Sequence, residues 1–345
     1  MVPPRLSTAL EIHRRVPVAD GHTDSLMWNR DLVTQSEDGD VDFPRLKEAG
    51  VKLQCFTVVT RGLPFIGGFP LFARRQKWPI QARQSEWTRC VWQLERMADF
   101  CRRSEGYASI AGTKQELEAN LRGDKLSALL GIEGAHCLEG KVERVDELWE
   151  RGVRFIGLTH FSNNDLGGAS TPLHGNKGLT PLGHQMLERM EARGMALDLA
   201  HASPRTIEDM FTHQAVRPFS SHTGVKGAKD HWRNLSDAHL KTVADRGGVV
   251  GIMFGVPRYL GGKTFDDVAR HIEHAISVMG EDAVGLGSDF DGFIPLPQGM
   301  RDVRDLPMLT DALLRRGMPE ARVEKVLGKN LTRFFTEVLG AARGL

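Results

Sequence analysis

Short apolar runs that end in polar residues alternate along this chain with longer stretches of helical periodicity. Eight of these runs have the length expected of buried strands. They cover residues 16–24, 51–60, 126–134, 153–161, 195–203, 218–223, 248–255 and 283–292. Because helical patterns separate them, the order indicates an α/β protein of parallel βα units, most simply closed as a (β/α)8 TIM-like barrel.

The connections between the runs differ in length. Helices are predicted over about 74–103 and 142–151, after Thr180-Pro181, and over 304–316, 319–328 and 330–342. Residues 62–123 exceed an ordinary βα connection, so they predict an insertion after the second strand, over one rim. No Ser/Gly linker divides residues 1–345, which predicts one domain. A doubly wound open sheet is the competing architecture, but no GxGxxG follows any run.

Six of the eight runs end in a side chain that can bind a metal or transfer a proton. In a (β/α)8 barrel the carboxyl ends of the strands surround one mouth, so we expect these side chains to gather there. A single histidine of this kind is better explained as a satisfied core residue. Six strand ends in one chain indicate a shared site, formed by His22 with Asp24, Glu133, His160, His201, His222 and Asp289.

The composition of this set favours a metal centre. His22 and Asp24 project to the same side because they stand two residues apart, and such a pair suits zinc, although a structural histidine is the alternative. Four histidines and three carboxylates are more than enough ligands for two divalent cations with a bridging carboxylate and a bridging water of lowered pKa. Glu133, the sole carboxylate on the third run, is the natural bridge. Asp289 is better placed as a general base or proton shuttle to that water.

Seven strings carry a resemblance to a known family: DGHTD, GIEGAH, LTHFSNN, GLTPLG, LDLAHAS, SSHT followed by WRN, and GSDFDG. Their order and approximate spacing, from about residue 16 to residue 292, resemble the membrane (renal-type) dipeptidases, peptidase family M19 of the amidohydrolase superfamily. The resemblance implies a (β/α)8 barrel with two zinc ions. One ion would bind His22 and Asp24, the other His201 and His222, with Glu133 bridging them.

The resemblance also implies roles in catalysis and substrate binding. His160 would stabilise the developing oxyanion near the scissile carbonyl. Arg233, in the WRN string, would grip the substrate's free α-carboxylate with its guanidinium fork. Asp289 would take a proton from the bridging hydroxide and pass it to the leaving amine. The implied enzyme is a dinuclear zinc dipeptidase for small L,L-dipeptides, and the family's tolerance of a C-terminal D-residue admits L,D-dipeptides.

The chain also departs from the family pattern. After THFSNN it continues with DLGG in place of a Thr-Pro-Trp-like stretch, and Gly255 follows Phe254 where family members often carry Tyr. These places and residues 62–103, which match no pattern, are expected to border the substrate. The metal site is therefore better supported than the side-chain preference. Hydrolysis of an N-acyl amino acid, a lactam or another small amide is the alternative function, and a catalytically silent barrel is a third.

Three further polar residues near the strand ends each admit two interpretations. Asp198 could orient a ligand imidazole or serve the structure of its loop. Asp291 could hold the loop after the last run or be a solvated turn carboxylate. His136 could support Glu133 or be a structural histidine.

The charge balance, the apolar stretches and the cysteines of the sequence limit which partners and which cellular compartment are expected. With 45 Lys and Arg against 44 Asp and Glu and no basic stripe, the sequence argues against nucleic acid and acidic membrane surfaces as partners. It contains no membrane-spanning apolar stretch and no apolar leader segment. Four cysteines without CxxC spacing fit a reducing compartment. We therefore expect a cytoplasmic enzyme with a small dipeptide substrate, and a homodimer is left open.

Overall fold

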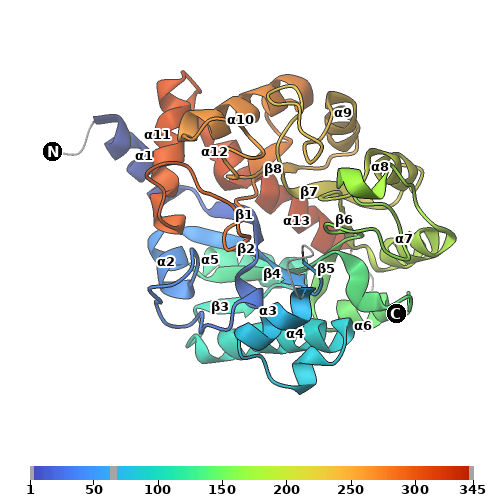
Figure 1. Ribbon diagram of the computed structural model, residues 1–345. Coiled ribbons are helices and arrows are strands. Elements are labelled where there is room, and N and C mark those ends of the chain that lie inside the picture. Colours follow the sequence, from blue (N-terminus) through green and yellow to red (C-terminus); the bar gives the residue numbers. More distant parts are fainter. Residues whose placement is uncertain (1–3, 63–67, 342–345) are drawn as a thin grey trace.

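The computed structural model describes residues 4–62 and 68–341. Its strands form one nine-stranded parallel sheet in the order β2-β1-β9-β8-β7-β6-β5-β4-β3, in which β2 also pairs with β4. The β2–β4 pairing closes eight strands into a barrel, which confirms the predicted (β/α)8 fold (Figure 1). The strands are β1 (Val18–Thr23), β2 (Val51–Val59), β3 (Ala108–Ile110), β4 (Leu126–Glu133), β5 (Val153–Gly157), β6 (Ala196–Asp198), β7 (Arg217–Thr223), β8 (Val250–Ile252) and β9 (Val284–Leu286).

Helices surround the strands in Figure 1. They are α1 (Pro4–Arg15), α2 (Phe43–Glu48), α3 (Gly68–Arg75), α4 (Glu86–Arg103), α5 (Lys114–Arg122), α6 (Arg144–Glu150), α7 (Pro181–Arg193), α8 (Pro204–Met210), α9 (Asp237–Asp245), α10 (Phe265–Met279), α11 (Leu306–Arg315), α12 (Glu320–Glu324) and α13 (Asn330–Ala341). Short 3-10 turns are η1 (Ser25–Met27), η2 (Gln81–Arg83), η3 (Ala135–Leu138), η4 (Pro172–His174) and η5 (Val303–Asp305), and the π-helical turn η6 (Lys325–Lys329) joins α12 to α13. Within the described ranges, no helix is both long enough and apolar enough to cross a bilayer.

Each predicted run contains a strand, and most predicted helices are confirmed. The helices predicted over 142–151, 304–316, 319–328 and 330–342 correspond to α6, α11, α12 with η6, and α13. The predicted start of α7 is also confirmed, because the Thr180 hydroxyl accepts a hydrogen bond from the Gly183 N–H at 3.1 Å.

The segment predicted as an insertion, residues 62–123, differs in detail from the sequence prediction. It contains α3, η2, α4, β3 and α5, while its residues 63–67 lie outside the described ranges. The amphipathic pattern predicted near 74–103 is one long helix only in its second part, because α4 begins after Ser85, whose hydroxyl accepts the Thr88 N–H at 3.1 Å. β3 was not predicted, because three residues that pair with the start of β4 are too few to show an alternating pattern.

Aromatic side chains fill the barrel at the amino-terminal end of its strands. Phe155 in β5 and Phe219 in β7 pack edge to face with ring centroids 5.2 Å apart. Two rings of α13 pack against them, Phe334 at 5.3 Å from Phe219 and Phe335 at 5.9 Å from Phe155. Gly131 makes room for this packing, since a Cβ there would lie 2.0 Å from the Phe155 ring. The predicted site residues lie toward the opposite end, where the strands finish.

Candidate active site

The carboxyl ends of the strands carry one buried cluster of histidines and carboxylates. All seven predicted members are less than a tenth exposed. His22 lies beneath the others, while the rest line a cavity of about 330 Å³ together with Arg233. The structure therefore brings together every predicted site residue: His22, Asp24, Glu133, His160, His201, His222, Asp289 and Arg233.

Glu133, the last residue of β4, lies at the centre of the cluster. Its Oε1 is 2.9 Å from His201 Nε2 and 3.4 Å from His222 Nε2. Its Oε2 is 3.7 Å from His22 Nε2, which in turn is 3.4 Å from Asp24 Oδ1. The two oxygens of one carboxylate thus face two different sets of ligand atoms.

These ligand atoms fit two divalent cations. One close group joins His22, Asp24 and Glu133, and another joins Glu133, His201 and His222. Nitrogen and carboxylate oxygen donors of this kind suit zinc. Glu133 Oε2 is buried without a hydrogen-bond partner, and a cation would satisfy it. Each of these two donor sets could hold a cation, and Glu133 belongs to both.

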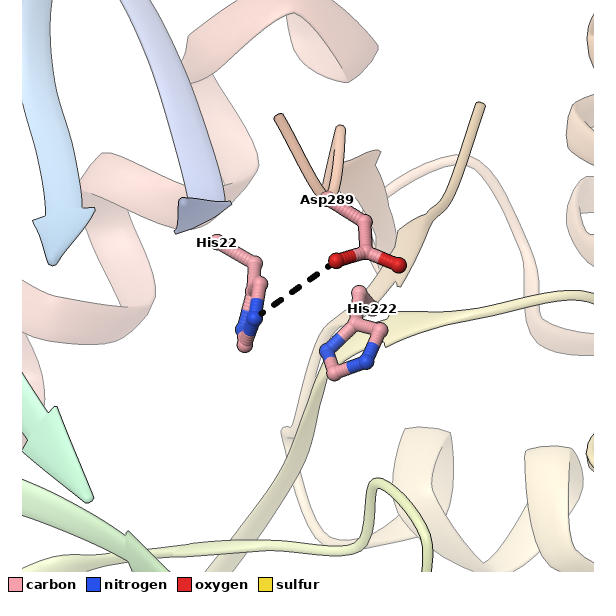
Figure 2. A group of neighbouring side chains, drawn as sticks. All are labelled: His22, His222 and Asp289. Carbon is pink, nitrogen blue, oxygen red and sulfur yellow. Dashed lines mark ion pairs between the residues drawn. The ribbon is translucent and has the colours of Figure 1, made fainter. Parts of the chain in front are cut away.

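Asp289, which follows β9, reaches the same cluster. Figure 2 shows His22, His222 and Asp289 pointing toward one another, and Asp289 Oδ1 lies 3.9 Å from His22 Nε2. These three residues form a further group that could hold a cation. Asp289 and His201 both have left-handed backbone angles, with φ at 64° in each, and such strain is characteristic of functional sites. The geometry admits Asp289 both as a metal ligand and as a proton-transfer group.

The carboxylates of Asp24, Glu133 and Asp289 lie close together in this buried space. Their negative charges shift the pKa values of the groups around them. Burial and then the charge of Asp24 raise the pKa of Glu133 and of Asp289 well above their usual values. Burial opposes protonation of His22, but Glu133 and Asp24 outweigh it and raise its pKa to about 9. Nearby divalent cations would neutralise this excess of negative charge.

Ser221, which the sequence analysis missed, orients two of the imidazoles. Its hydroxyl oxygen lies 3.2 Å from His22 Nδ1 and 2.9 Å from His222 Nδ1, so the Nε2 atoms are left to face the cluster. Asp198 contacts backbone instead of an imidazole. Its carboxylate accepts the N–H groups of Ala200 at 3.0 Å and Ser221 at 2.9 Å, which supports its structural interpretation.

His160 borders the cluster with a defined tautomer. Its Nδ1–H donates to the carbonyl of Arg61 at 2.9 Å, while its Nε2 lies 3.5 Å from Glu133 Oε1. A neutral ring therefore presents an unprotonated Nε2 to the cluster. Donation from Nε2 to an oxyanion requires His160 to be the imidazolium.

Arg233, after β7, is a buried cation at the edge of the cluster. Its Nη2 donates to His222 Nε2 at 2.7 Å and to the His222 carbonyl at 3.0 Å. Within the described part of the chain, no carboxylate lies within ion-pair distance of it, so its charge is available to an anion in the cavity. Since a cation on His222 Nε2 would use the same lone pair, Arg233 would have to give up this one hydrogen bond when the cation binds.

Comparison with known proteins decides the family. Residues 6–345 match the sequence profile of the membrane dipeptidases, peptidase family M19. The chain belongs to family M19. Dipeptidase verJ of Clonostachys rogersoniana is 29% identical over 340 residues, which cover 96% of this M19 chain and 87% of the relative.

Solved structures agree with this assignment. A structure of dipeptidase AC, a metallopeptidase of family M19, is 25% identical with a TM-score of 0.82, covering 94% of this chain and 99% of its own. An amidohydrolase from Pseudomonas aeruginosa is 27% identical with a TM-score of 0.77, covering 96% and 99%. The predicted family and enzyme class are therefore confirmed, and the M19 chain is a metallo-dipeptidase.

Aromatic residues complete the lining of the M19 cavity, and those of residues 62–103 lie in a segment that the sequence analysis expected to border the substrate. Phe69 and Phe72 come from α3, Tyr259 from the segment after β8 and Phe293 from the segment after β9. One signal was present at Gly255, where a Cβ would lie 2.8 Å from the Tyr259 ring. Glycine at this position, where family members often carry Tyr, thus leaves room for the ring of Tyr259.

Proposed function

We propose that this M19 dipeptidase is a dinuclear zinc enzyme that hydrolyses small dipeptides with a free C-terminal carboxylate, including L,L- and L,D-dipeptides. The observation that carries the proposal is the buried Arg233, which faces the cavity without a carboxylate partner in the described structure. A guanidinium fork matches a carboxylate in geometry and charge. A substrate without a carboxylate would leave this cation unpaired in the pocket, which is costly.

The same proposal assigns the metal ligands to two cations. His22 and Asp24 would hold one cation, His201 and His222 the other, and Glu133 would be shared, as its two oxygens suggest. When bound, the two cations would lower the pKa of a water molecule toward neutrality and so supply hydroxide without a nucleophilic side chain.

Two residues would handle the proton and the developing charge. Asp289 would accept the proton on its carboxylate and return it to the leaving amine, and its raised pKa favours a carboxylate that can hold a proton. His160 would stabilise the oxyanion through its Nε2, because its Nδ1 proton is already donated to the Arg61 carbonyl. Burial lowers the pKa of the free ring to about 4, so Nε2 would become a donor only as the negative charge that develops on the substrate raises this pKa.

Exchange of Arg233 for Met tests the carboxylate clamp. Arg233→Met keeps much of the apolar stem and removes the fork, so kcat/KM for a free dipeptide should fall by about ten- to several-hundred-fold, since a hydrogen bond to a charged group contributes roughly 1.5–3 kcal/mol. The decisive comparison uses the same dipeptide with an amidated C-terminus. Wild type should strongly prefer the free acid, and the variant should lose most of that preference.

The second candidate is another amidohydrolase reaction, on an N-acyl amino acid, a lactam or a small amide. The likeness to a Pseudomonas aeruginosa amidohydrolase favours keeping it. Equal cleavage of the acid and the amide by wild type would mean that Arg233 is not a carboxylate clamp, and would place this candidate ahead.

We also propose that residues 1–345 act as one catalytic domain in the cytoplasm. All four cysteines are free, and three of them are buried, which suits a reducing compartment. The proposed substrate is a small dipeptide, and no nucleic acid or membrane partner is invoked.

A further inference from the structure

A contiguous set of rings, which we call the aromatic wall, stands on one side of the cavity mouth. It consists of Trp28 after η1, Phe69 and Phe72 on α3, and Phe293 after β9. The ring centroids of Trp28 and Phe293 are 4.9 Å apart, those of Phe72 and Phe293 5.8 Å, and those of Phe69 and Phe72 5.3 Å. Phe69, Phe72 and Phe293 line the same cavity as Glu133, with Trp28 packed behind them. The wall is therefore within the substrate space.

Phe293 is held in a conformation that its side chain does not favour. Its φ is 60°, a left-handed angle that is uncommon for a bulky residue, and its side chain is 56% exposed. A core position would explain a strained phenylalanine by packing, but this ring lies at the mouth. Local strain that presents a side chain at a pocket points to a role in binding.

The loop that carries Phe293 is fixed by its neighbour Asp291. This carboxylate accepts the Ser25 hydroxyl at 2.5 Å and the Asp40 N–H at 2.8 Å, and it pairs with Arg30. Its backbone carbonyl accepts the indole N–H of Trp28 at 2.8 Å. Asp291 thus holds the loop, which is one of the two roles considered for it. Through its hydrogen bond with Trp28 it also fixes the position of Trp28 relative to Phe293.

The wall and Arg233 come from different parts of the barrel rim. Arg233 follows β7, whereas the wall follows β9, β1 and β2, with β8 between the two groups in the sheet order. In a dipeptide, the C-terminal side chain shares a carbon with the α-carboxylate and must stay near Arg233. The N-terminal residue lies across the scissile bond, on the side where the wall stands.

We infer that the aromatic wall binds the side chain of the substrate's N-terminal residue, so that the enzyme prefers dipeptides with a bulky apolar residue at that position. This inference rests on the proposed dipeptidase function with Arg233 as the carboxylate clamp. Apolar surface removed from water against the three rings that line the cavity favours leucine or phenylalanine over glycine. We expect kcat/KM to rise by about 10- to 100-fold across that series, the usual scale for hydrophobic pockets.

Two matched series of dipeptides test the inference on the zinc-loaded enzyme. One varies the N-terminal residue through Gly, Ala, Leu and Phe before a constant alanine, and the other varies the C-terminal residue after a constant alanine. Phe293→Ala should fold, because this side chain is exposed, and should flatten the first series. Phe72→Ala should act in the same direction. Leu173→Ala is the control, since Leu173 is 92% exposed and does not line the cavity.

The possible results distinguish a failure of this inference from a failure of the proposed dipeptidase function. A steep N-terminal series in wild type and Leu173→Ala, flattened in Phe293→Ala, would support the wall as the N-terminal subsite. Equal kcat/KM across that series, a preference confined to the C-terminal series, or an unchanged series in Phe293→Ala would overturn the inference while dipeptide hydrolysis stands. Hydrolysis of no peptide in either series would reject the proposed function and the inference together.

Discussion

Glu133 is the single residue on which both candidate metal positions depend. Its two oxygens face different ligand sets, and one of them has no hydrogen-bond partner. Asp24 and His201, by contrast, each belong to only one of the groups that could hold a cation. Loss of Glu133 should therefore affect both cations, whereas loss of a histidine such as His201 should affect one more than the other.

Glu133→Gln tests this shared position. Wild type purified without chelator should contain about two divalent metals per chain, with zinc favoured by the nitrogen and oxygen donors. The variant should lose metal at both positions and lose turnover with it, as measured by elemental analysis and steady-state kinetics. Retention of full metal content and near wild-type turnover would place the bridge elsewhere, and one metal per chain in reconstituted wild type would contradict a dinuclear site.

Asp289→Asn separates proton transfer from metal binding. Asparagine is nearly isosteric but cannot accept the proton, so turnover should fall by about 100-fold or more, with a smaller change in KM. Metal analysis of the same variant is the second readout, because Asp289 lies 3.9 Å from His22 Nε2. Loss of a metal would make Asp289 a ligand, and unchanged turnover with a large rise in KM would move it to substrate binding.

Ser221→Ala should weaken the metal site without removing a ligand. The Ser221 hydroxyl contacts the Nδ1 atoms of both His22 and His222, and loss of such orienting contacts typically lowers metal affinity by about 10- to 100-fold. Competition with a chromophoric chelator measures the affinity directly. Ser220→Ala is the matched control, because the neighbouring Ser220 hydroxyl is buried without a hydrogen-bond partner. Equal affinities in the two variants would show that Ser221 does not orient the ligands.

Some residues of the candidate site could be predicted from the sequence, and others could not. His22, Glu133 and His222 could be predicted because each lies within one residue of the end of a strand, and strand ends meet in a barrel. Ser221 could not, because its role depends on the distance between β1 and β7, which are not neighbours in the sheet. Phe293 could not either, since its position depends on a backbone angle that no sequence pattern specifies.

At the scale of elements, α4 supports the segment that follows Asp24. Arg96 of α4 donates hydrogen bonds to the carbonyls of Leu26 at 2.9 Å, Trp28 at 2.9 Å and Arg30 at 2.7 Å. One side chain therefore fixes η1 and the residue that backs the aromatic wall. The sequence predicted an amphipathic helix here, but not this function of its polar face, because the partners are backbone carbonyls about seventy residues away.

Arg96→Met should lower the free energy of unfolding by at least about 2 kcal/mol, because three carbonyls lose a charged donor. Denaturant titration measures this loss. Arg102→Met on the same helix is the control, since Arg102 is exposed and pairs with Asp99, and exposed ion pairs contribute about 0–1 kcal/mol. Similar unfolding midpoints for the two variants would show that the Arg96 contacts do not stabilise this segment.

At the scale of the whole molecule, the barrel could be predicted from the eight runs, but its closure could not be located. Closure requires β2 to pair with β4 across the long segment 62–123, and β3 also pairs with β4. Contacts between distant parts of the chain hold the closed molecule together. His13 of α1, for example, lies 2.8 Å from the Thr310 hydroxyl of α11, and His271 of α10 receives the Val225 N–H at 3.0 Å and contacts the Leu260 carbonyl at 3.1 Å.

These two histidines predict how stability depends on pH. Burial lowers the pKa of His13 and of His271 from 6.5 to about 4, so each is neutral in the folded protein. Between about pH 6.5 and 4 the unfolded chain binds more protons than the folded chain, and stability therefore rises with pH in this window. The contribution is complete above the unfolded pKa and is lost as the pH falls toward 4. Each histidine should account for about 3 kcal/mol of that loss, from the size of its pKa shift.

His271→Gln tests this whole-molecule prediction. Glutamine does not titrate, so unfolding free energies measured by denaturant titration at pH 7, 6, 5 and 4 should decline less steeply in the variant than in wild type. His174→Gln, on the η4 turn, is the control and should follow the wild-type slope. Chelator-treated protein should be compared throughout, because metal release in acid would add its own pH dependence. If His271→Gln and wild type lose stability in parallel between pH 7 and 4, the buried neutral histidine is not a source of acid sensitivity.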